Sequence, residues 1–363
     1  EQWAAEHYAM PVFVYADYFH TIGYLNLTHV SETDYSTSGQ LTNTTTLSYN
    51  NRHLVSEKRH MMSTGDERVT QTKYPFDYPS TTVYQDMTNR HMLNFSIEET
   101  ELKNSTFLRA TKNNYNDYGN HIIDLITTET KQGAGAYETR VRYHGFDDRG
   151  NLLSVSKETD VRHSFIYGYN KTYPIAEVVN GGTLTSAYTS FEANSPGNWT
   201  IGGSARNSTD ARTGKVCYEL SGGALSISGL DPTKTYILSY WAKPGATHSA
   251  TGTTSTAQGA SHAGWNQWEK TISGVSSTTL SGSGLFDEVR LYPKGALMNT
   301  FAYEPLVGMI NKCDQRNAVT YYEYDASNRL TVIRDDDKNI VKKICYNYYN
   351  EAQDCTGLPT APL

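Results

Sequence analysis

A short pattern that recurs along the chain constrains its fold more than any other feature. It consists of an aromatic residue, a small polar residue, two variable positions, a turn residue, a polar residue and leucine. The clearest copies are residues 35–41 (YSTSGQL), 146–152 (FDDRGNL) and 324–330 (YDASNRL). Residues 115–120 (YNDYGN) keep the turn and lack the leucine, and weaker copies begin at Tyr49 and Tyr303. Such recurrence indicates a repeated structural unit.

The chemistry of the pattern is that of a β-hairpin. The aromatic residue ends one strand, Asp or Asn begins the turn by bonding its own backbone, and Gly or Asn at the fifth position tolerates a positive φ. Leucine then opens the return strand. One repeat is two short strands and two turns in about 20 residues, and each hairpin needs neighbours to bury its face. The sequence therefore predicts an all-β sheet of consecutive hairpins, with a helix content below about 10%.

Composition supports the all-β expectation. The chain of 363 residues contains 28 Tyr, and its hydrophobic residues make up only 37%. Apolar burial therefore depends on tyrosine, whose ring suits a strand and whose hydroxyl needs a partner. The net charge of −7 argues against nucleic acid as a partner. No apolar run is long enough to span a membrane, and no signal-like segment follows Glu1, so we expect a piece of a longer protein or a processed product.

The repeat stops between about Gly181 and Pro293, where the composition shifts to Gly, Ser and Thr. This stretch holds four of the five tryptophans, namely Trp199, Trp241, Trp265 and Trp268. Its short alternating apolar stretches are separated by turn signals about every ten residues, as is typical of an antiparallel sandwich. The sequence predicts a repeat sheet over residues 1–180, an inserted jelly-roll sandwich over 181–296 that folds alone, and a second repeat region over 297–363.

The hairpin pattern resembles the tyrosine–aspartate repeats of the RHS/YD-repeat family, especially its secreted Gram-negative bacterial members. The resemblance is carried by DDRGNLLSV with YGYNKTYPIAEVVN, and by YEPLVGM with YYEYDASNRLTVIRDDDKNIVK. It implies a long sheet that spirals into a shell, which either encloses a toxic domain or serves as an adhesive or structural body. It also implies, as partners, the remainder of a larger repeat polypeptide and outer-membrane secretion or surface-assembly proteins.

The stretch between the repeats resembles a galactose-binding-like jelly roll of the kind found in carbohydrate-binding modules. The landmarks are SFEANSPGNWTI, GLDPTKTYILSYWAKPG, GWNQWEKTISG and LFDEVRLYP, in that order. In such modules a Glu of the opening strand and an Asp of the closing strand often help to hold a structural calcium ion. Glu192 and Asp287 occupy the matching positions here. Ca²⁺ takes six to eight oxygen ligands, and the sequence names only these two candidates.

The resemblance also makes glycans candidate partners. Sugar binding uses flat aromatic faces, which Trp199, Trp265 and Trp268 could supply. The alternative is that these residues belong to the core, as we expect for Trp241, which lies within an apolar strand next to Tyr240. Many modules of this shape bind no ligand.

Four cysteines allow three fully paired connectivities, and we expect an oxidising compartment. The segment CYNYYNEAQDC resembles a Cys-closed tail that follows the last repeat in related chains. This likeness implies a disulfide between Cys345 and Cys355, which would add about 2–3 kcal/mol. Cys217 is expected to be buried and free.

The sequence contains no strong catalytic motif: no phosphate-binding glycine loop, no nucleophile elbow and no zinc-binding pattern. We therefore expect a non-catalytic repeat scaffold, secreted or on the cell surface, with a glycan-binding or adhesive inserted module. Two alternatives stay open. One is a piece of a toxin-enclosing shell whose cargo lies outside this chain, and the other is a polysaccharide-active enzyme with carboxylates that are not recognisable in sequence.

Overall fold

The structure is a computed structural model that describes residues 23, 25–37, 39–62 and 64–346. These residues form two compact units. The first contains the described residues up to Lys73 together with Glu99–Leu108, and the second contains Tyr74–Glu98 together with the described residues from Arg109 onward. This division does not coincide with the three predicted segments, which stay a prediction. Among the described residues, no helix has the length and apolarity that a membrane crossing requires.

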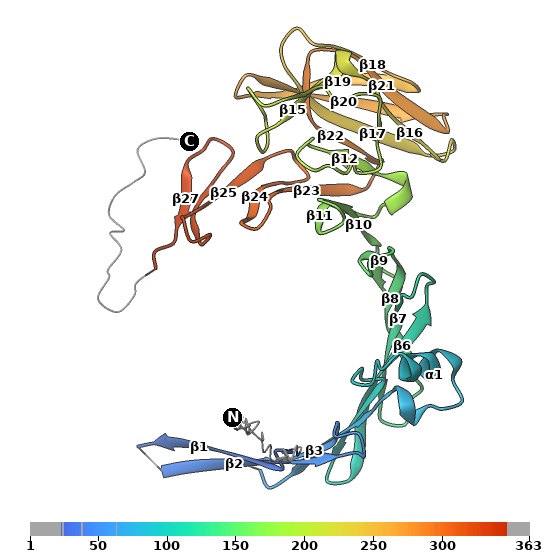
Figure 1. Cartoon of the computed structure of the whole chain (residues 1–363), viewed down its shortest axis with the longest axis vertical. Helices are drawn as coiled ribbons and strands as arrows, with labels where there is room; N and C mark the ends of the chain where they lie inside the picture. The colour runs from blue at the N-terminus through green and yellow to red at the C-terminus, as the bar shows by residue number, and fades with distance from the viewer. Residues whose placement is uncertain (1–22, 24, 38, 63, 347–363) are drawn as a thin grey trace, which may run out of the picture. The chain divides into compact units, whose positions relative to one another are not determined.

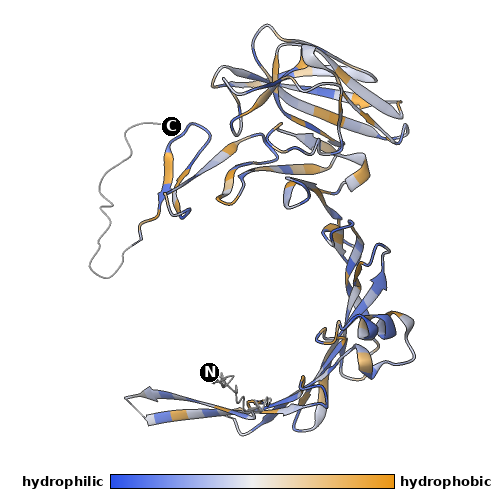
Figure 2. Ribbon diagram, in the orientation of Figure 1, coloured by the Kyte–Doolittle hydropathy of each residue, from blue (hydrophilic) through white to orange (hydrophobic). Residues whose placement is uncertain are grey.

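The first unit is an antiparallel sheet of hairpins with a polar surface. Each strand pairs with the next in the order β1 (His29–Ser36), β2 (Gly39–Tyr49), β3 (Val55–Met61), β4 (Glu67–Lys73) and β5 (Glu98–Lys103). Hydrophilic residues predominate along β1 and β2 (Figure 2), and the hydroxyls of Thr33 and Thr42 lie 2.9 Å apart across them. Tyr35, the aromatic residue of the first repeat copy, is 81% exposed, because these strands offer it no apolar partner.

The second unit contains the other repeat strands, each antiparallel to its neighbour, except that residues 106–108 at the start of the first of them belong to the first unit. In order they are β6 (Thr106–Asp117), β7 (Ile123–Gln132), β8 (Glu138–Phe146), β9 (Leu152–Lys157), β10 (His163–Gly168), β11 (Tyr173–Val179), β23 (Leu297–Glu304), β24 (Gly308–Cys313), β25 (Val319–Tyr324), β26 (Leu330–Arg334) and β27 (Ile340–Lys343). The step from β11 to β23 is a direct pairing, in which Val179 faces Leu297 and Ala176 faces Thr300. The sheet thus continues across the interruption, as Figure 1 shows.

The residues between β11 and β23 form two antiparallel sheets. The seven-stranded sheet contains β12 (Ala187–Thr189), β14 (Arg206–Asn207), β15 (Cys217–Glu219), β17 (Thr235–Ala242), β19 (Thr253–His262), β20 (Trp265–Ser273) and β22 (Leu285–Pro293). The four-stranded sheet contains β13 (Thr200–Ile201), β16 (Leu225–Ser228), β18 (Thr247–Ala250) and β21 (Ser277–Ser283). Apolar side chains from both sheets, including Leu238, Leu280 and Phe286, share one buried core. The predicted insertion of an antiparallel sandwich into a sheet of hairpins is confirmed.

Helices contribute little to the described residues. They are α1 (Thr82–Asn89) and the 3-10 helices η1 (Pro75–Asp77), η2 (Thr183–Thr185) and η3 (Leu220–Gly222). Strands account for 56% of the described residues and helices for 5%, so the predicted all-β class and helix content are confirmed. The sequence did not predict α1, whose only buried residues are Tyr84 and Met87. Two apolar positions three residues apart give too short a pattern to indicate a helix.

The repeat turns have the predicted chemistry. In the copy that begins at Phe146, Oδ1 of Asp147 accepts hydrogen bonds from the backbone amides of Arg149 and Asn151 at 2.8 and 2.9 Å. The fifth residue, Gly150, has a φ of 79°. Asp325 accepts equivalent bonds in its own turn, where the fifth residue has a φ of 58°. The two repeat copies share this turn geometry, which explains why Asp or Asn and then Gly or Asn recur in the pattern.

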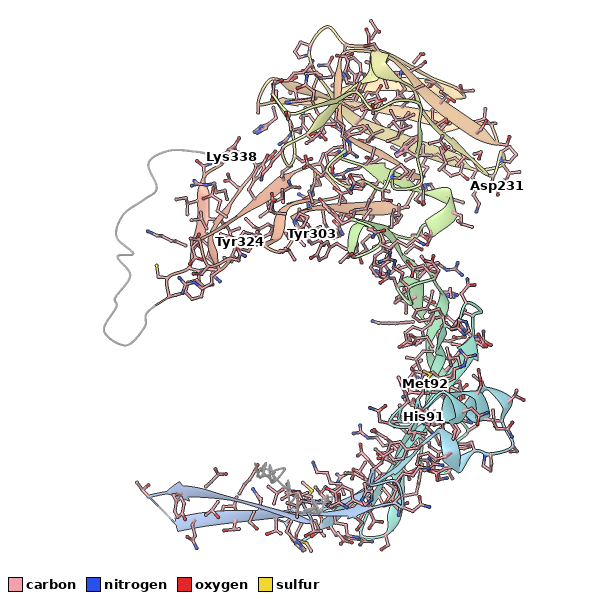
Figure 3. All side chains as sticks on the ribbon, viewed as in Figure 1. His91, Met92, Asp231, Tyr303, Tyr324 and Lys338 are labelled. Carbon is pink, nitrogen blue, oxygen red and sulfur yellow. The ribbon has the colours of Figure 1, made fainter. Side chains whose placement is uncertain are left out.

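Tyrosine hydroxyls tie successive strands together at the position of the repeat leucine. Tyr167 donates to the carbonyl of Leu152 at 3.1 Å, and Tyr346 donates to the carbonyl of Leu330 at 3.0 Å. Tyr324, labelled in Figure 3, donates to Met309 in the same way at 2.8 Å. The acceptor lies 15 or 16 residues earlier in each case. The expectation that tyrosine hydroxyls need partners is met by the backbone of the neighbouring strand.

Candidate functional site: the junction between sandwich and repeat sheet

Two charged residues on β22 are buried where the sandwich contacts the repeat sheet. Glu288 and Arg290 are each 1% exposed, and Nη2 of Arg290 lies 2.9 Å from Oε2 of Glu288. A β-bulge accompanies this pair, since Glu288 and Val289 together oppose only Tyr240 on β17. Glu288 has a φ of 52°, which is costly for a residue other than glycine. A bulge of this kind redirects a side chain out of the regular alternation of the strand.

The Glu288 carboxylate receives hydrogen bonds from three separate segments. Its Oε1 accepts from the hydroxyl of Tyr188 on β12 at 2.5 Å and from that of Thr213 at 2.8 Å. Its Oε2 accepts from the hydroxyl of Thr300, on repeat strand β23, at 2.8 Å. Burial, and then the charge of Glu288, raise the pKa of Tyr188 well above its ordinary value, so Tyr188 remains a donor. A buried carboxylate is tolerated only when it is satisfied in this way.

Arg290 extends the same network into the repeat sheet. Its Nη1 donates to the carbonyl of Asp314, which follows β24, at 2.9 Å, and its Nη2 donates to Thr300 at 3.0 Å. An apolar cluster adjoins these contacts. It combines Ile166, Ile175, Ala176, Val178 and Met298 of the repeat strands with Tyr188 and Ala193 of the insertion. The two parts of this unit are therefore joined by a packed interface as well as by the chain itself.

A second ion pair joins the sandwich to the turn between β26 and β27. Nη2 of Arg212 lies 2.7 and 2.9 Å from the two carboxylate oxygens of Asp336. Its Nη1 donates to the hydroxyl of Tyr321 at 3.1 Å, and its guanidinium carbon lies 4.4 Å from the ring centre of Trp241. The Arg212 side chain is 1% exposed. An arginine held by a carboxylate, a hydroxyl and an aromatic face has little freedom to bind anything else.

A cleft of about 330 Å³ lies beside this ion pair. Its lining comprises Ala211, Arg212, Gly214, His262, Ala263, Tyr321, Asp336, Asp337 and Lys338. Lys338, labelled in Figure 3, lies over the ring of Tyr321. Loss of hydration, and then the charge of Arg212, lower its pKa to about 8, while burial raises the pKa of Tyr321 to about 12. The polar groups of the cleft bond mainly to one another, as expected of a structural contact.

The two predicted calcium ligands both accept hydrogen bonds from backbone amides of residues 212–216. Oε1 of Glu192 accepts from the amides of Lys215 and Val216 at 2.6 and 2.5 Å. Oδ2 of Asp287 accepts from the amides of Arg212 and Thr213 at 2.8 and 3.0 Å. Amide donors therefore face the oxygens that a cation would need. Among the described residues no group of three or more acidic, His or Cys side chains could hold a metal. The calcium site stays a prediction from the resemblance, and this donor set does not by itself supply the required oxygens.

The predicted sugar platform is not assembled as the sequence suggested. Trp199 and Trp265 are 2% and 1% exposed, and the ammonium of Lys243 lies 4.7 Å from the ring centre of Trp265. Trp268 packs against the main core, whereas Trp265 packs with Trp241 in a separate cluster. Residues three apart on a strand point to opposite faces, so Trp265 and Trp268 cannot form one surface. The expected burial of Trp241 is confirmed.

The structure tests one of the two predictions made for the cysteines. Cys217 is buried and free, as expected, and so is Cys313. Cys355 lies outside the described residues, so its predicted disulfide with Cys345 stays a prediction.

The sequence did not single out Glu288, Arg290, Arg212 or Asp336. The sequence did contain an indication that Glu288 and Arg290 are buried and paired. The stretch LFDEVRLYP places three charged residues in a strand with apolar neighbours on both faces. Charged residues in such a position must be paired. The partners could not be found from sequence, since Thr300 and Asp336 belong to the resumed repeat region.

No protein-family model and no curated protein matches the chain. Two solved structures that it resembles are described as TcdB2-TccC3-Cdc42 and TcdB2-TccC3, with sequence identities of 11% and 12% and a TM-score of 0.17 for both. Each alignment covers 85% of this chain and 15% of the solved chain.

Proposed function

We propose that this chain is a non-catalytic part of a secreted or surface-exposed repeat protein. Its hairpin sheet acts as a scaffold, and the inserted sandwich is held on that scaffold as an adhesive module. Glycans are the ligand class suggested by the resemblance of the insertion to carbohydrate-binding modules. The observation that carries the proposal is the buried network of Glu288 and Arg290, which fixes β22 of the sandwich to Thr300 and Asp314 of the repeat region.

The junction favours fixed display over a flexible tether. Domains within one chain move relative to each other by default unless their interface is extensive and well packed. Here the sandwich contacts the repeat sheet through the buried network, through the adjoining apolar cluster and through the ion pair of Arg212 with Asp336. These contacts would be unnecessary if the insertion were only a spacer on a loose linker.

The proposal is tested by measuring the distance between the two parts in solution. Spin labels on bioorthogonal amino acids at the exposed positions Lys234 and Ser327 report on the sandwich and on a repeat turn. We expect a narrow distance distribution in the wild-type chain and a broad one when Arg290→Met and Asp336→Asn are combined. Broad distributions in the wild-type chain would contradict fixed display. Hydrolysis of a glycan, abolished by one carboxylate substitution, would contradict the non-catalytic role.

A further inference from the structure

A second cleft lies where the insertion leaves the repeat sheet and rejoins it. Its volume is about 460 Å³. It is lined from the repeat sheet by Arg162 and Asn180, and from the insertion by Thr185, Lys234 and Lys294, together with a proline and two glycines. The three charged residues adjoin β10, β17 and β22. The cleft therefore depends on both parts of this unit and on the junction between them.

Three residues of the lining are positively charged and none is negatively charged. Arg162, Lys234 and Lys294 are all exposed, although the chain as a whole has a net charge of −7. Within the described residues, no carboxylate lies within ion-pairing distance of Arg162 or Lys294. A carboxylate oxygen of Asp231, labelled in Figure 3, lies 3.9 Å from Nζ of Lys234, and an exposed pair of this kind contributes little. The cleft thus concentrates positive charge that the protein leaves largely unneutralised.

Backbone hydrogen bonds fix the positions from which two of these charges project. The carbonyl of Arg162 accepts from the amide of Asn180 at 2.8 Å, and the amide of Lys294 donates to the carbonyl of Thr235 at 2.8 Å. Nδ2 of Asn180 also donates to the carbonyl of Gly295 at 3.2 Å, which ties the repeat side of the cleft to the insertion side. The basic side chains are therefore carried by a connected backbone framework.

A neutral histidine orients the guanidinium of Arg162. Nη2 of Arg162 donates to Nδ1 of His144 at 3.2 Å, and Nε2 of His144 lies 3.0 Å from Oγ of Ser156. Loss of hydration, and then the charges of Arg162 and Arg142, lower the pKa of His144, so the ring remains in the neutral form that can accept at Nδ1. This contact does not neutralise the arginine, and it leaves other N–H groups of the five for an anion.

The lining contains no aromatic side chain, and this indicates the kind of anion that fits. Single-stranded nucleic acid binds through stacking of its bases on aromatic rings, and a neutral sugar also needs a flat ring face. A carboxylate or a sulfate needs only positive charge and N–H donors. Both groups protrude from the rings of acidic polysaccharides, so a concave basic site can receive them. Thr185 and Asn180 add a hydroxyl and an amide, which can bond to sugar hydroxyls.

We propose that this cleft binds an acidic polysaccharide, whose carboxylate or sulfate groups lie against Arg162, Lys234 and Lys294. The inference rests on the proposed function, because it names the class of glycan that the displayed module would hold. It differs from the platform expected from sequence, since recognition depends on charge and not on the faces of tryptophan rings. It also places the ligand at the junction, where the repeat sheet contributes Arg162 to the site.

The test titrates the full chain with charged and neutral forms of the same polymer, by calorimetry. Dextran sulfate is paired with dextran, and polygalacturonate with its methyl ester. We expect at least one of the two anionic polymers to bind at least about tenfold more tightly than its neutral form, the gain typical of a hydrogen bond to a charged group. The binding should weaken as salt is added, because the basic side chains are exposed. Preference for dextran sulfate identifies sulfate esters as the recognised group, and preference for polygalacturonate identifies uronates.

Substitutions then locate the ligand. Arg162→Gln combined with Lys294→Gln should weaken binding of the preferred polymer at least about tenfold, and the melting temperature should stay the same, because both side chains are exposed. Arg149→Gln combined with Arg316→Gln is the matched control. It removes the same charge from two exposed turn positions outside the cleft and should leave binding intact. Lys294→Arg keeps the charge and should keep the binding.

Three results would overturn the inference. They are equal binding of the charged and neutral polymers, equal weakening by the cleft pair and the control pair, and tighter binding of single-stranded DNA or of phosphatidylglycerol vesicles than of either polysaccharide. The display function is judged separately, by the spin-label distance in the chain without polymer. A narrow distance without polymer binding would contradict this inference alone, and a broad distance with polymer binding would contradict fixed display alone.

Discussion

Val179 and Leu297 face each other across the β11–β23 ladder, although the whole sandwich lies between them in the chain. The insertion therefore replaces nothing but the tip of one hairpin. The residue after Val179 is Asn180, which already has a φ of 62°, and Gly181 follows it. Asn-Gly is the preferred pair for a two-residue hairpin turn in which both residues have positive φ.

Deletion of residues 182–296 should leave a folded repeat sheet. Asn180 and Gly181 would then connect the paired residues Val179 and Leu297 directly. We expect the shortened chain to keep an antiparallel β spectrum in circular dichroism and amide protection in β11 and β23 by hydrogen exchange. A matched control with Asn180→Pro and Gly181→Val should fold less well, because these residues do not adopt the required positive φ. Loss of protection in β11 in the Asn-Gly version would show that the sheet depends on the sandwich.

Arg290→Met should destabilise the sandwich by about 3–5 kcal/mol, because it leaves the buried Glu288 carboxylate without its cation. The measurement is urea denaturation followed by tryptophan fluorescence, since four of the five tryptophans lie in the insertion. The double variant Arg290→Met with Glu288→Gln should recover part of the loss, because it removes the unpaired charge. A loss below about 1 kcal/mol in the single variant, well short of the range for breaking a buried pair, would contradict the role assigned to the network.

Tyr324→Phe should weaken the repeat sheet locally, because it removes the hydrogen bond to the carbonyl of Met309. We expect a loss of about 0.5–1.5 kcal/mol, measured as faster hydrogen exchange in β24 and β25. Tyr35→Phe is the control, since Tyr35 is 81% exposed and should have no effect. Equal hydrogen-exchange rates in the Tyr324 variant and the wild type would show that this hydroxyl hydrogen bond does not stabilise the repeat sheet.

Lys338→Met should change how stability depends on pH. The pKa of Lys338 is about 8 in the folded chain, below its ordinary 10.5, so between these values the unfolded chain binds more protons. The lowered pKa means that protonated Lys338 destabilises the folded chain at low pH. This penalty is lost, and the free energy of unfolding increases, as pH rises from 8 toward 10. We expect the melting temperature of the wild type to approach that of Lys338→Met between pH 7 and 9.5. A constant difference across this range would show that the pKa is not lowered.

The sequence predicted those features that depend on neighbouring residues. The Asp147 and Gly150 turn positions follow from local backbone chemistry, and the change in composition at Gly181 marks where the sheet is interrupted. Features that depend on distant contacts were not predictable. Nothing near Glu288 in the sequence indicates that Thr300 completes its hydrogen bonding. Of the predicted glycan-binding residues Trp199, Trp265 and Trp268, the last two do not share a face, because the alternation of strand β20 places them on opposite sides.

The tyrosine links also bear on how a protein of this kind can change its length. Each link joins a hydroxyl to a carbonyl 15 or 16 residues earlier. Tyr167 and Tyr324 lie on the strand next to that of their acceptor, and Tyr346 follows β27, the strand next to that of Leu330. Gain or loss of one complete hairpin, with its own tyrosine and leucine, therefore preserves every remaining link. Copy number can vary between descendants of such a gene by duplication or deletion of whole hairpins, while a cut within a hairpin would separate a tyrosine from its acceptor.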